Sequence, residues 1–324
     1  MNTSSNSNGT VDSFWLITDC KIKKTAKGST FLDLTLSDKS TEINGKLWDY
    51  NEQLHGKFES GELVKIRGSI SQYNGQDQLT VNRIRKAVSA DNIDPSDFVK
   101  SAEFSGDAML SEITAVIDAM KNEDIKRLTE AIISDYRTKL LYWPAAFKLH
   151  HAIRGGLLMH TLSVLRLAQS VAALYPFLNN DLLFAGAILH DIAKTEEFEV
   201  TDTGLASDYS VEGNLLGHLA RGAIIIDEYS KKLNIDRKIS VMLQHMVLSH
   251  HGEPEFGAAV RPAFAEAEIL SQLDRLDATI YEMSEAVSKT APDGFSDRVW
   301  CLDNRKLYNH ATGGDGLKVD LIKD

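Results

Sequence analysis

Cysteine is nearly absent from this 324-residue chain: Cys20 and Cys301 lie far apart and form no CxxC pair. Neither a disulfide framework nor a thiolate metal site is therefore expected. The sequence also lacks an unbroken apolar run of about 18 residues, so no membrane span is predicted. Residues 1–10, MNTSSNSNGT, carry neither a charge nor an apolar block, which is typical of a disordered tail and not of a signal peptide. These absences predict a cytoplasmic protein.

An overall positive charge is also missing, since the net charge is -11, and this alone argues against a nucleic-acid partner. The charge is unevenly distributed, however. Residues 11–90 carry 12 Lys and Arg against 10 Asp and Glu, a balance of +2, so the rest of the chain holds -13. The length and the 43% apolar content suffice for two domains with different electrostatic character.

Residues 11–90 alternate apolar and polar side chains between short turns, which predicts a five-stranded barrel. Leu32, Leu34 and Leu36 would face inward. The outer face would gather aromatic and basic side chains: Phe31, Lys46, Trp48, Lys65 and Arg67, with Tyr73 from the following turn. Rings that stack on bases and cations that follow phosphates suit single-stranded nucleic acid. Alternatively, Phe31 and Trp48 cover a neighbouring domain or subunit.

The acid-rich segment with Pro95 predicts a linker over residues 91–101, and helical periodicity dominates from 102 to 290. Apolar spacing predicts helices at 107–121, 123–139, 155–174, 180–194, 213–233, 236–250 and 263–285. Residues 291–324 form a C-terminal tail. The second domain is therefore expected to be all-α.

Eight of the ten histidines lie between His150 and His251. A lone histidine on an apolar helix face is usually a core residue with one hydrogen bond. Five histidines and two aspartates on separate apolar helices would instead leave many buried polar groups to satisfy, and a shared metal satisfies them together. The candidate metal ligands are His160, His190, Asp191, His218, His250, His251 and Asp274.

Imidazole and carboxylate ligands without thiolate suit Mn²⁺, Fe²⁺, Co²⁺, Ni²⁺ or Zn²⁺, and we expect Mn²⁺. Adjacent helical residues project about 100° apart, so His190 and Asp191 can share a metal site only where the helix frays. Asp191 can then bridge two ions. The hypothesis is a dinuclear centre in which one ion takes His160, His190 and Asp274 and the other takes His218, His250 and His251.

Lys194 follows Asp191 by about one helical turn. Two ions would supply a bridging hydroxide for in-line attack on a phosphodiester, and Lys194 would hold a nonbridging oxygen of the phosphate. Alternatively, Lys194 is a solvated cation at a helix C-terminus. Candidates for binding a substrate phosphate are His151, Arg154 and Arg261, with helix capping or an ordinary surface position as alternatives. Asp277, on the same helix face as Asp274, would orient a ligand.

Three stretches carry a family resemblance. The run G…LDLTLSDKS…W…G…VKIRGSI…YNGQDQL resembles the OB-fold nucleic-acid-binding module. His160, HD at 190–191, His218, HH at 250–251 and Asp274 resemble the HD-domain superfamily of metal-dependent phosphohydrolases. LHHAIRGGLLMHT, ILHDIAK and SHHGEPEFGAAVRP, with the OB-like module in front, resemble the YhaM-type 3′→5′ exoribonucleases over nearly the whole chain.

The resemblance implies an N-terminal all-β OB-fold barrel followed by an all-α HD domain. It implies a metal-dependent 3′→5′ exonuclease that converts single-stranded RNA to nucleoside 5′-monophosphates, with single-stranded DNA as a further substrate and homo-oligomerisation left open. A phosphohydrolase of small nucleotides, whose barrel serves regulation or oligomerisation, is the alternative. A nucleic-acid-binding protein with an inert metal site is a third, weaker one.

Overall fold

The computed structural model describes residues 10–38, 41–73, 76–147 and 151–313. The predicted N-terminal tail, apart from Thr10, and the end of the C-terminal tail lie outside these ranges, as does the side chain of Tyr73. The chain divides into two compact units. Unit 1 comprises Met1–Ser101 with Val200–Ser207, and unit 2 comprises Ala102–Glu199 with Asp208–Asp324.

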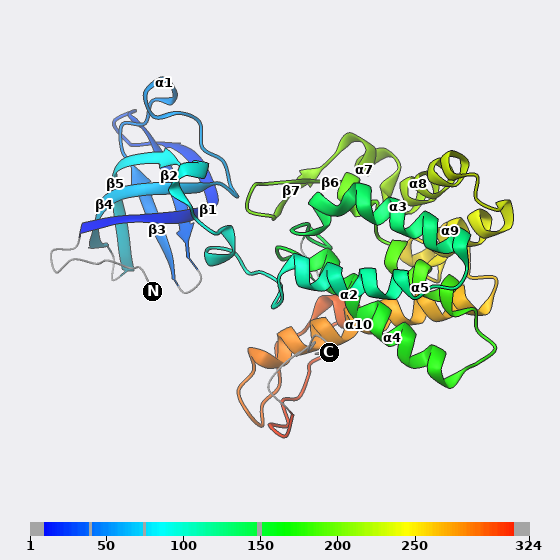
Figure 1. Cartoon of the computed structure of the whole chain (residues 1–324). Coiled ribbons are helices and arrows are strands. Elements are labelled where there is room, and N and C mark those ends of the chain that lie inside the picture. The colour runs from blue at the N-terminus through cyan, green and yellow to red at the C-terminus, as the bar shows by residue number, and fades with distance from the viewer. Residues whose placement is uncertain (1–9, 39–40, 74–75, 148–150, 314–324) are drawn as a thin grey trace. The chain divides into compact units, whose positions relative to one another are not determined.

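Unit 1 is built on a closed five-stranded barrel (Figure 1). Its strands are β1 (Thr10–Lys24), β2 (Thr30–Ser37), β3 (Glu42–Leu47), β4 (Leu63–Tyr73) and β5 (Gln76–Lys86), and the short helix α1 (Glu52–His55) connects β3 to β4. The strand order is β1-β2-β3-β5-β4, with the barrel closed by antiparallel pairing of β1 and β4. Only the β3–β5 pair among these described strands is parallel. The predicted five-stranded barrel is confirmed.

The period-two pattern gives the inner face of the barrel correctly. Leu32, Leu34 and Leu36 of β2 are buried in its core, together with Val64 and Ile66 of β4. Gly45 also faces inward, and a Cβ atom there would lie 2.7 Å from Cδ1 of Leu36. Such tight packing leaves no room for a ligand inside, so any binding surface of the barrel is on its outer face.

Unit 2 is helical, and a short two-stranded sheet lies in the sequence between two of its helices (Figure 1). Its helices are α2 (Gly106–Asp118), α3 (Glu123–Leu140), α4 (Gly156–Leu174), α5 (Asn180–Leu189), α6 (Lys194–Glu197), α7 (Val211–Leu215), α8 (Gly217–Leu233), α9 (Arg237–Ser249) and α10 (Ala265–Ser288). The strands are β6 (Phe198–Val200) and β7 (Ala206–Tyr209). Polar N-caps begin several helices, including Ser105, Asn122, Asn179 and Asp236.

Two predicted helices are divided in the structure. The helix expected over 180–194 ends at Leu189, and turns with i→i+3 bonds lead from it to α6. The helix expected over 213–233 is broken before Gly217, whose φ of +66° is left-handed and favours glycine. The β6–β7 hairpin was not predicted. Both breaks place a candidate metal ligand, His190 or His218, at a helix end.

Helix α4 is long and apolar enough to cross a membrane by length and composition alone. It packs against α2, α5 and α10, and ten of its residues are buried, including His160. A buried core helix passes the same test, so the criterion is weak evidence for a membrane span.

Candidate metal centre and nucleic-acid-binding face

The seven candidate ligands come from five helix regions of unit 2 and converge around Asp191. His160 lies on α4, His190 caps α5, His218 is in the first turn of α8, His250 caps α9, and Asp274 is on α10. Oδ2 of Asp191 lies 3.6 Å from Nε2 of His160 and 3.4 Å from Nε2 of His190. Its Oδ1 lies 3.7 Å from Nε2 of His218 and 3.6 Å from Nε2 of His250. The two carboxylate oxygens thus face two different groups of imidazoles.

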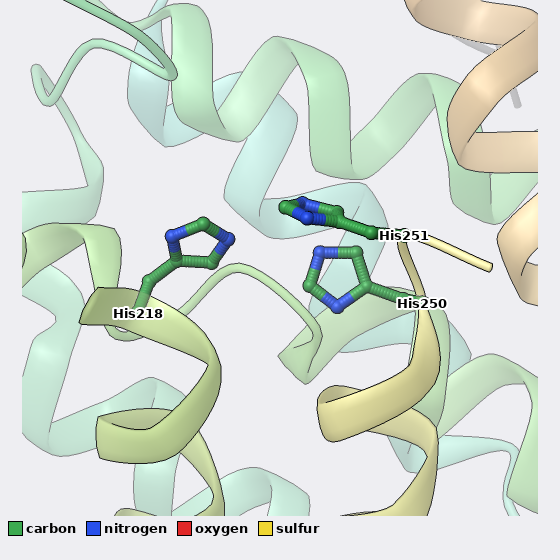
Figure 2. A group of neighbouring side chains, drawn as sticks. All are labelled: His218, His250 and His251. Carbon is green, nitrogen blue, oxygen red and sulfur yellow. The ribbon is translucent and has the colours of Figure 1, made fainter. Parts of the chain in front are cut away.

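Each group brings its ligand atoms close together. Nε2 of His160 lies 3.0 Å from Oδ1 of Asp274 and 3.1 Å from Nε2 of His190. Ligand atoms of His218, His250 and His251 lie within 4.8 Å of one another. Figure 2 shows these three imidazoles turned toward a common space between α8 and the end of α9. Both spacings suit nitrogen and oxygen atoms that share a metal ion.

Four of the histidines are oriented by hydrogen bonds at their outer nitrogens. Nδ1 of His190 donates to the carbonyl of Ala187 (2.9 Å), and Nδ1 of His250 donates to that of Val247 (2.8 Å). Because a carbonyl only accepts, the proton of each neutral ring is on Nδ1 and the lone pair of Nε2 points inward. Carboxylates hold the other two: Asp277 lies 2.7 Å from Nδ1 of His160, and Glu197 lies 3.0 Å from Nδ1 of His218.

Several inward atoms have no hydrogen-bond partner although they are buried. They are Oδ1 of Asp191, Nε2 of His218, Nε2 of His250 and Nδ1 of His251. Buried polar atoms are almost always paired, so four such orphans in one place need an explanation. A divalent cation supplies it, because one carboxylate oxygen and three imidazole nitrogens are a donor set for Mn²⁺, Fe²⁺, Co²⁺, Ni²⁺ or Zn²⁺. The residues present therefore fit a metal centre.

The charges of these groups also suit a cation. Burial alone would raise the pKa of Asp191, but the ammonium of Lys194 and the imidazole of His190 hold it well below its usual range. Burial, assisted by His250 and His218, lowers the pKa of His251 to about 3. The carboxylate is thus ionised and His251 neutral at neutral pH, which are the forms that bind metal. His160 is the exception: burial opposes its protonation, yet Asp274 and Asp277 raise its pKa to about 10, so a metal ion would have to displace its proton.

Lys194 begins α6, and its Nζ lies 2.6 Å from Oδ2 of Asp191 in a buried ion pair. The ammonium therefore lies beside the centre. The turn that carries Lys194 is anchored by α3 and the residues after it: Nε1 of Trp143 donates to the carbonyl of Lys194 (2.8 Å), and Nζ of Lys139 donates to that of Thr195 (2.8 Å).

The three expected phosphate-binding residues lie in different surroundings. His151 is 2% exposed, and its Nε2 lies 3.0 Å from Oδ2 of Asp277, so it is joined to His160 through that carboxylate. The guanidinium of Arg154 lies over the ring of Tyr142 at 5.3 Å, and exposed Arg261 donates to Glu253 (2.7 Å).

Sequence reasoning identified Asp277 as an orienting residue but missed Glu197. Oε1 of Glu197 accepts from the backbone N–H of His218 (3.2 Å) and lies against Nδ1 of the same residue. The only sequence signal is a pair of acids shortly after Lys194. Its neighbour, Glu196, instead pairs with Arg221 (2.6 Å) and Tyr136, so the sequence alone does not tell which acid faces the centre.

On the barrel, the predicted aromatic and basic residues form two groups separated by β5. Phe31 and Trp48 lie with ring centroids 4.8 Å apart, and Nζ of Lys46 lies 5.6 Å and 5.5 Å from their centroids. Phe31 is 8% exposed because this group covers it, whereas Trp48 is 42% exposed. We call Phe31, Lys46 and Trp48 the aromatic group.

The second group lies on β4 and its partner β1. Lys65 and Arg67 both face Asp12, at 3.8 Å and 2.6 Å, and Nζ of Lys65 lies 5.1 Å from the ring centroid of Phe14. Lys65 and Arg67 lie apart from the aromatic group along the strand order, because β4 is beside β1 and β5 and not beside β2 or β3. Their role in binding a nucleic acid stays a prediction.

Comparisons with known proteins agree with both units. A family model described as "HD domain" matches residues 157–279, and one described as "OB-fold nucleic acid binding domain" matches residues 15–87. A protein of Listeria monocytogenes named 3′-5′ exoribonuclease YhaM is 41% identical over 303 residues, which cover 93% of this chain and 95% of that protein. Proteins of the same name from Bacillus licheniformis and Halalkalibacterium halodurans are 40% and 39% identical, and each match covers 92% of this chain. The matches cover 94% and 92% of those two proteins.

Proposed function

Because this chain belongs to the YhaM family of 3′-5′ exoribonucleases, we propose that it removes nucleotides from the 3′ end of single-stranded RNA and releases nucleoside 5′-monophosphates. The observation that supports this best is the convergence of unpartnered ligand atoms around Asp191, in a chain that also carries a barrel with an aromatic group. Single-stranded DNA is proposed as a second substrate. A cytoplasmic location and self-association remain predictions.

Two divalent ions would be held here, one by His160, His190 and Asp274 and the other by His218, His250 and His251, and Asp191 would serve both. Bound ions would neutralise phosphate charge and make water nucleophilic at neutral pH. The protein fixes the ligand geometry through Asp277, Glu197 and the helix-end carbonyls of Ala187 and Val247. Lys194, positioned on Asp191, adds a positive charge near the place where phosphate charge develops.

The proposal is tested with purified protein, Mn²⁺ and a 5′-labelled single-stranded RNA on a denaturing gel. A ladder that shortens from the 3′ end is expected, together with nucleoside 5′-monophosphates as products. A 3′-blocked strand should stay intact. Intact RNA throughout, with hydrolysis of cyclic or polyphosphorylated nucleotides instead, would favour the small-nucleotide alternative.

Glu197→Gln is expected to weaken Mn²⁺ binding by roughly 10–100-fold, because the carboxylate that orients His218 is lost. Calorimetric titration of Mn²⁺ into the metal-free full-length protein measures this directly. Glu196→Gln is the matched control, since this neighbouring acid contacts Arg221 and not His218. Equal losses in both variants would show that the effect comes from the segment as a whole and not from the contact with His218.

Trp48→Ala is expected to lower kcat/KM about tenfold on RNA longer than the roughly 4–16 nucleotides that one OB fold covers. Trinucleotides should be affected much less, because they are shorter than the strand that one OB fold covers. Trp48→Phe should retain most of the activity because it keeps a stacking ring. An equal loss on long and short substrates would contradict a role of the aromatic group in holding the strand.

A further inference from the structure

An exposed aromatic side chain, Phe256, is held on an ordered loop of unit 2 that follows His251. The loop contains a short 3-10 turn, Pro254–Phe256, closed by a hydrogen bond from the N–H of Gly257 to the carbonyl of Pro254 (3.0 Å). Ala258 anchors the loop because it is buried, and the N–H of Ala259 donates to the carbonyl of Leu248 (3.0 Å). Phe256 is nevertheless 61% exposed. Because these contacts already hold the loop backbone, less entropy is lost when a ligand stacks on the exposed ring.

The ring of Phe256 is paired with a cation from another element. The guanidinium of Arg275 on α10 lies 5.5 Å from its centroid. Among the residues that the structure describes, Arg275 forms no ion pair with a carboxylate, although the chain is acidic overall. The positive charge of Arg275 is therefore available to an anionic ligand that also offers a flat face to Phe256.

Arg275 and the loop of Phe256 each adjoin a candidate metal ligand. Arg275 follows Asp274 in the sequence, and Gly257 follows Phe256. A Cβ atom on Gly257, whose φ is +102°, would lie 3.4 Å from Nδ1 of His251, so the loop backbone contacts this imidazole. The side chain of Asp274 is 15% exposed, whereas those of His160 and His190 are fully buried. The side chain of His218 is 13% exposed, so solvent reaches the centre past both Asp274 and His218, and exposed Arg275 is next to the first of them in the sequence.

We propose that Phe256 and Arg275 bind the 3′-terminal nucleotide of a single-stranded RNA, with the terminal base stacked on Phe256 and a backbone phosphate paired with Arg275. A nucleotide offers a flat base, which can stack on the ring of Phe256, and a negatively charged phosphate, which can pair with the guanidinium of Arg275. The inference rests on the proposed function and deepens it, because it assigns recognition of the strand end to the loop after His251. Stacking does not depend on base identity, so the site would accept all four bases.

The experiment measures binding of labelled trinucleotides, which are shorter than the barrel site, to the full-length protein by fluorescence anisotropy in Mn²⁺, with non-hydrolysable linkages to prevent cleavage. One RNA is intact, and the other lacks its 3′-terminal base. Phe256→Ala is expected to weaken binding of the intact RNA about tenfold and to leave binding of the abasic RNA unchanged. Phe256→Tyr should restore affinity. Arg275→Gln should weaken both RNAs equally and reduce the salt dependence of binding.

Phe177→Ala is the matched control. Phe177 is also highly exposed, but it follows the C-terminal end of α4, which lies about 20 Å along that helix from His160. Phe256→Ala binding identical to wild type, or an equal loss on intact and abasic RNA, would overturn the inference. So would a change of oligomeric state in light scattering, which would make the pair a subunit contact. If the wild type does not shorten RNA at all in Mn²⁺, the proposed function itself fails.

Discussion

Replacing Asp191 by Asn is expected to lower kcat/KM for single-stranded RNA by about 10³-fold or more, because one neutral amide cannot provide the negative charge that both ions share. The two oxygens of Asp191 face different imidazole groups, so the change weakens both halves of the centre. Single-turnover assays with 5′-labelled RNA and saturating Mn²⁺ measure this loss. Activity within tenfold of the wild type would contradict the bridging role of Asp191.

A folding defect must be separated from the loss of chemistry in this variant. Asp191→Asn leaves the buried ammonium of Lys194 without its carboxylate, which costs up to about 3–5 kcal/mol. The double variant Asp191→Asn with Lys194→Met removes that unpaired charge. Its thermal stability is expected to recover toward that of the wild type while its activity stays low. Recovery of both would mean that the single variant was inactive only because it was unfolded.

Removal of divalent metal is expected to lower the midpoint of thermal unfolding of the helical unit by about 5–10 °C. An ion present at 100 times its dissociation constant adds about 2.7 kcal/mol to the free energy of unfolding, and a domain of this size shifts by about 2–4 °C per kcal/mol. The stabilisation arises because a bound ion would satisfy the buried ligand atoms that have no hydrogen-bond partner. Circular dichroism at a helical wavelength, in EDTA and then with increasing Mn²⁺, measures the shift.

A histidine within α9, His245, provides the control for the histidine that caps this helix, His250. His250→Gln should lose most of the metal-dependent shift, because Nε2 of His250 is one of the unpartnered atoms. His245→Gln should retain the metal-dependent shift. Nε2 of His245 accepts a hydrogen bond from the N–H of Ala263 (2.9 Å), and His245 lies more than one helical turn before His250. Identical unfolding midpoints with EDTA and Mn²⁺ in the wild type would show that no ion binds at this centre.

The sequence predicts most helices of unit 2 because their apolar spacing is long and regular, and it predicts the barrel because the alternation is strict. The sequence does not predict where a helix stops when tertiary contacts, and not a local helix-breaking residue, end it. The helix with His190 ends five residues early, where backbone bonds change to i→i+3, and no glycine or proline marks the change. Glu197 was missed for a similar reason, since its role depends on a partner 21 residues away.

On the barrel, alternation gives the direction in which a side chain points but not what covers it. Phe31 points outward as predicted, yet Trp48 and Lys46 pack over it. The separation of Lys65 from the aromatic group follows from strand order, which local periodicity does not encode. Resemblance to a known family, in contrast, carries long-range information, and the candidate ligands that it implies are found together in one place.

The centre contains the same local arrangement twice. His190 and His250 each occupy the C-cap of a helix, and each donates from Nδ1 to a carbonyl three residues earlier, so that it satisfies one of the carbonyls left open at the helix end. The next residues, Asp191 and His251, follow the last regular turn. If α5 or α9 continued for one further turn, the carbonyl of Ala187 or Val247 would also accept a backbone N–H four residues later, in competition with the imidazole. The position at which each helix stops therefore helps to fix the orientation of a ligand, and a substitution that extends either helix would weaken that orientation while every ligand stays in the sequence.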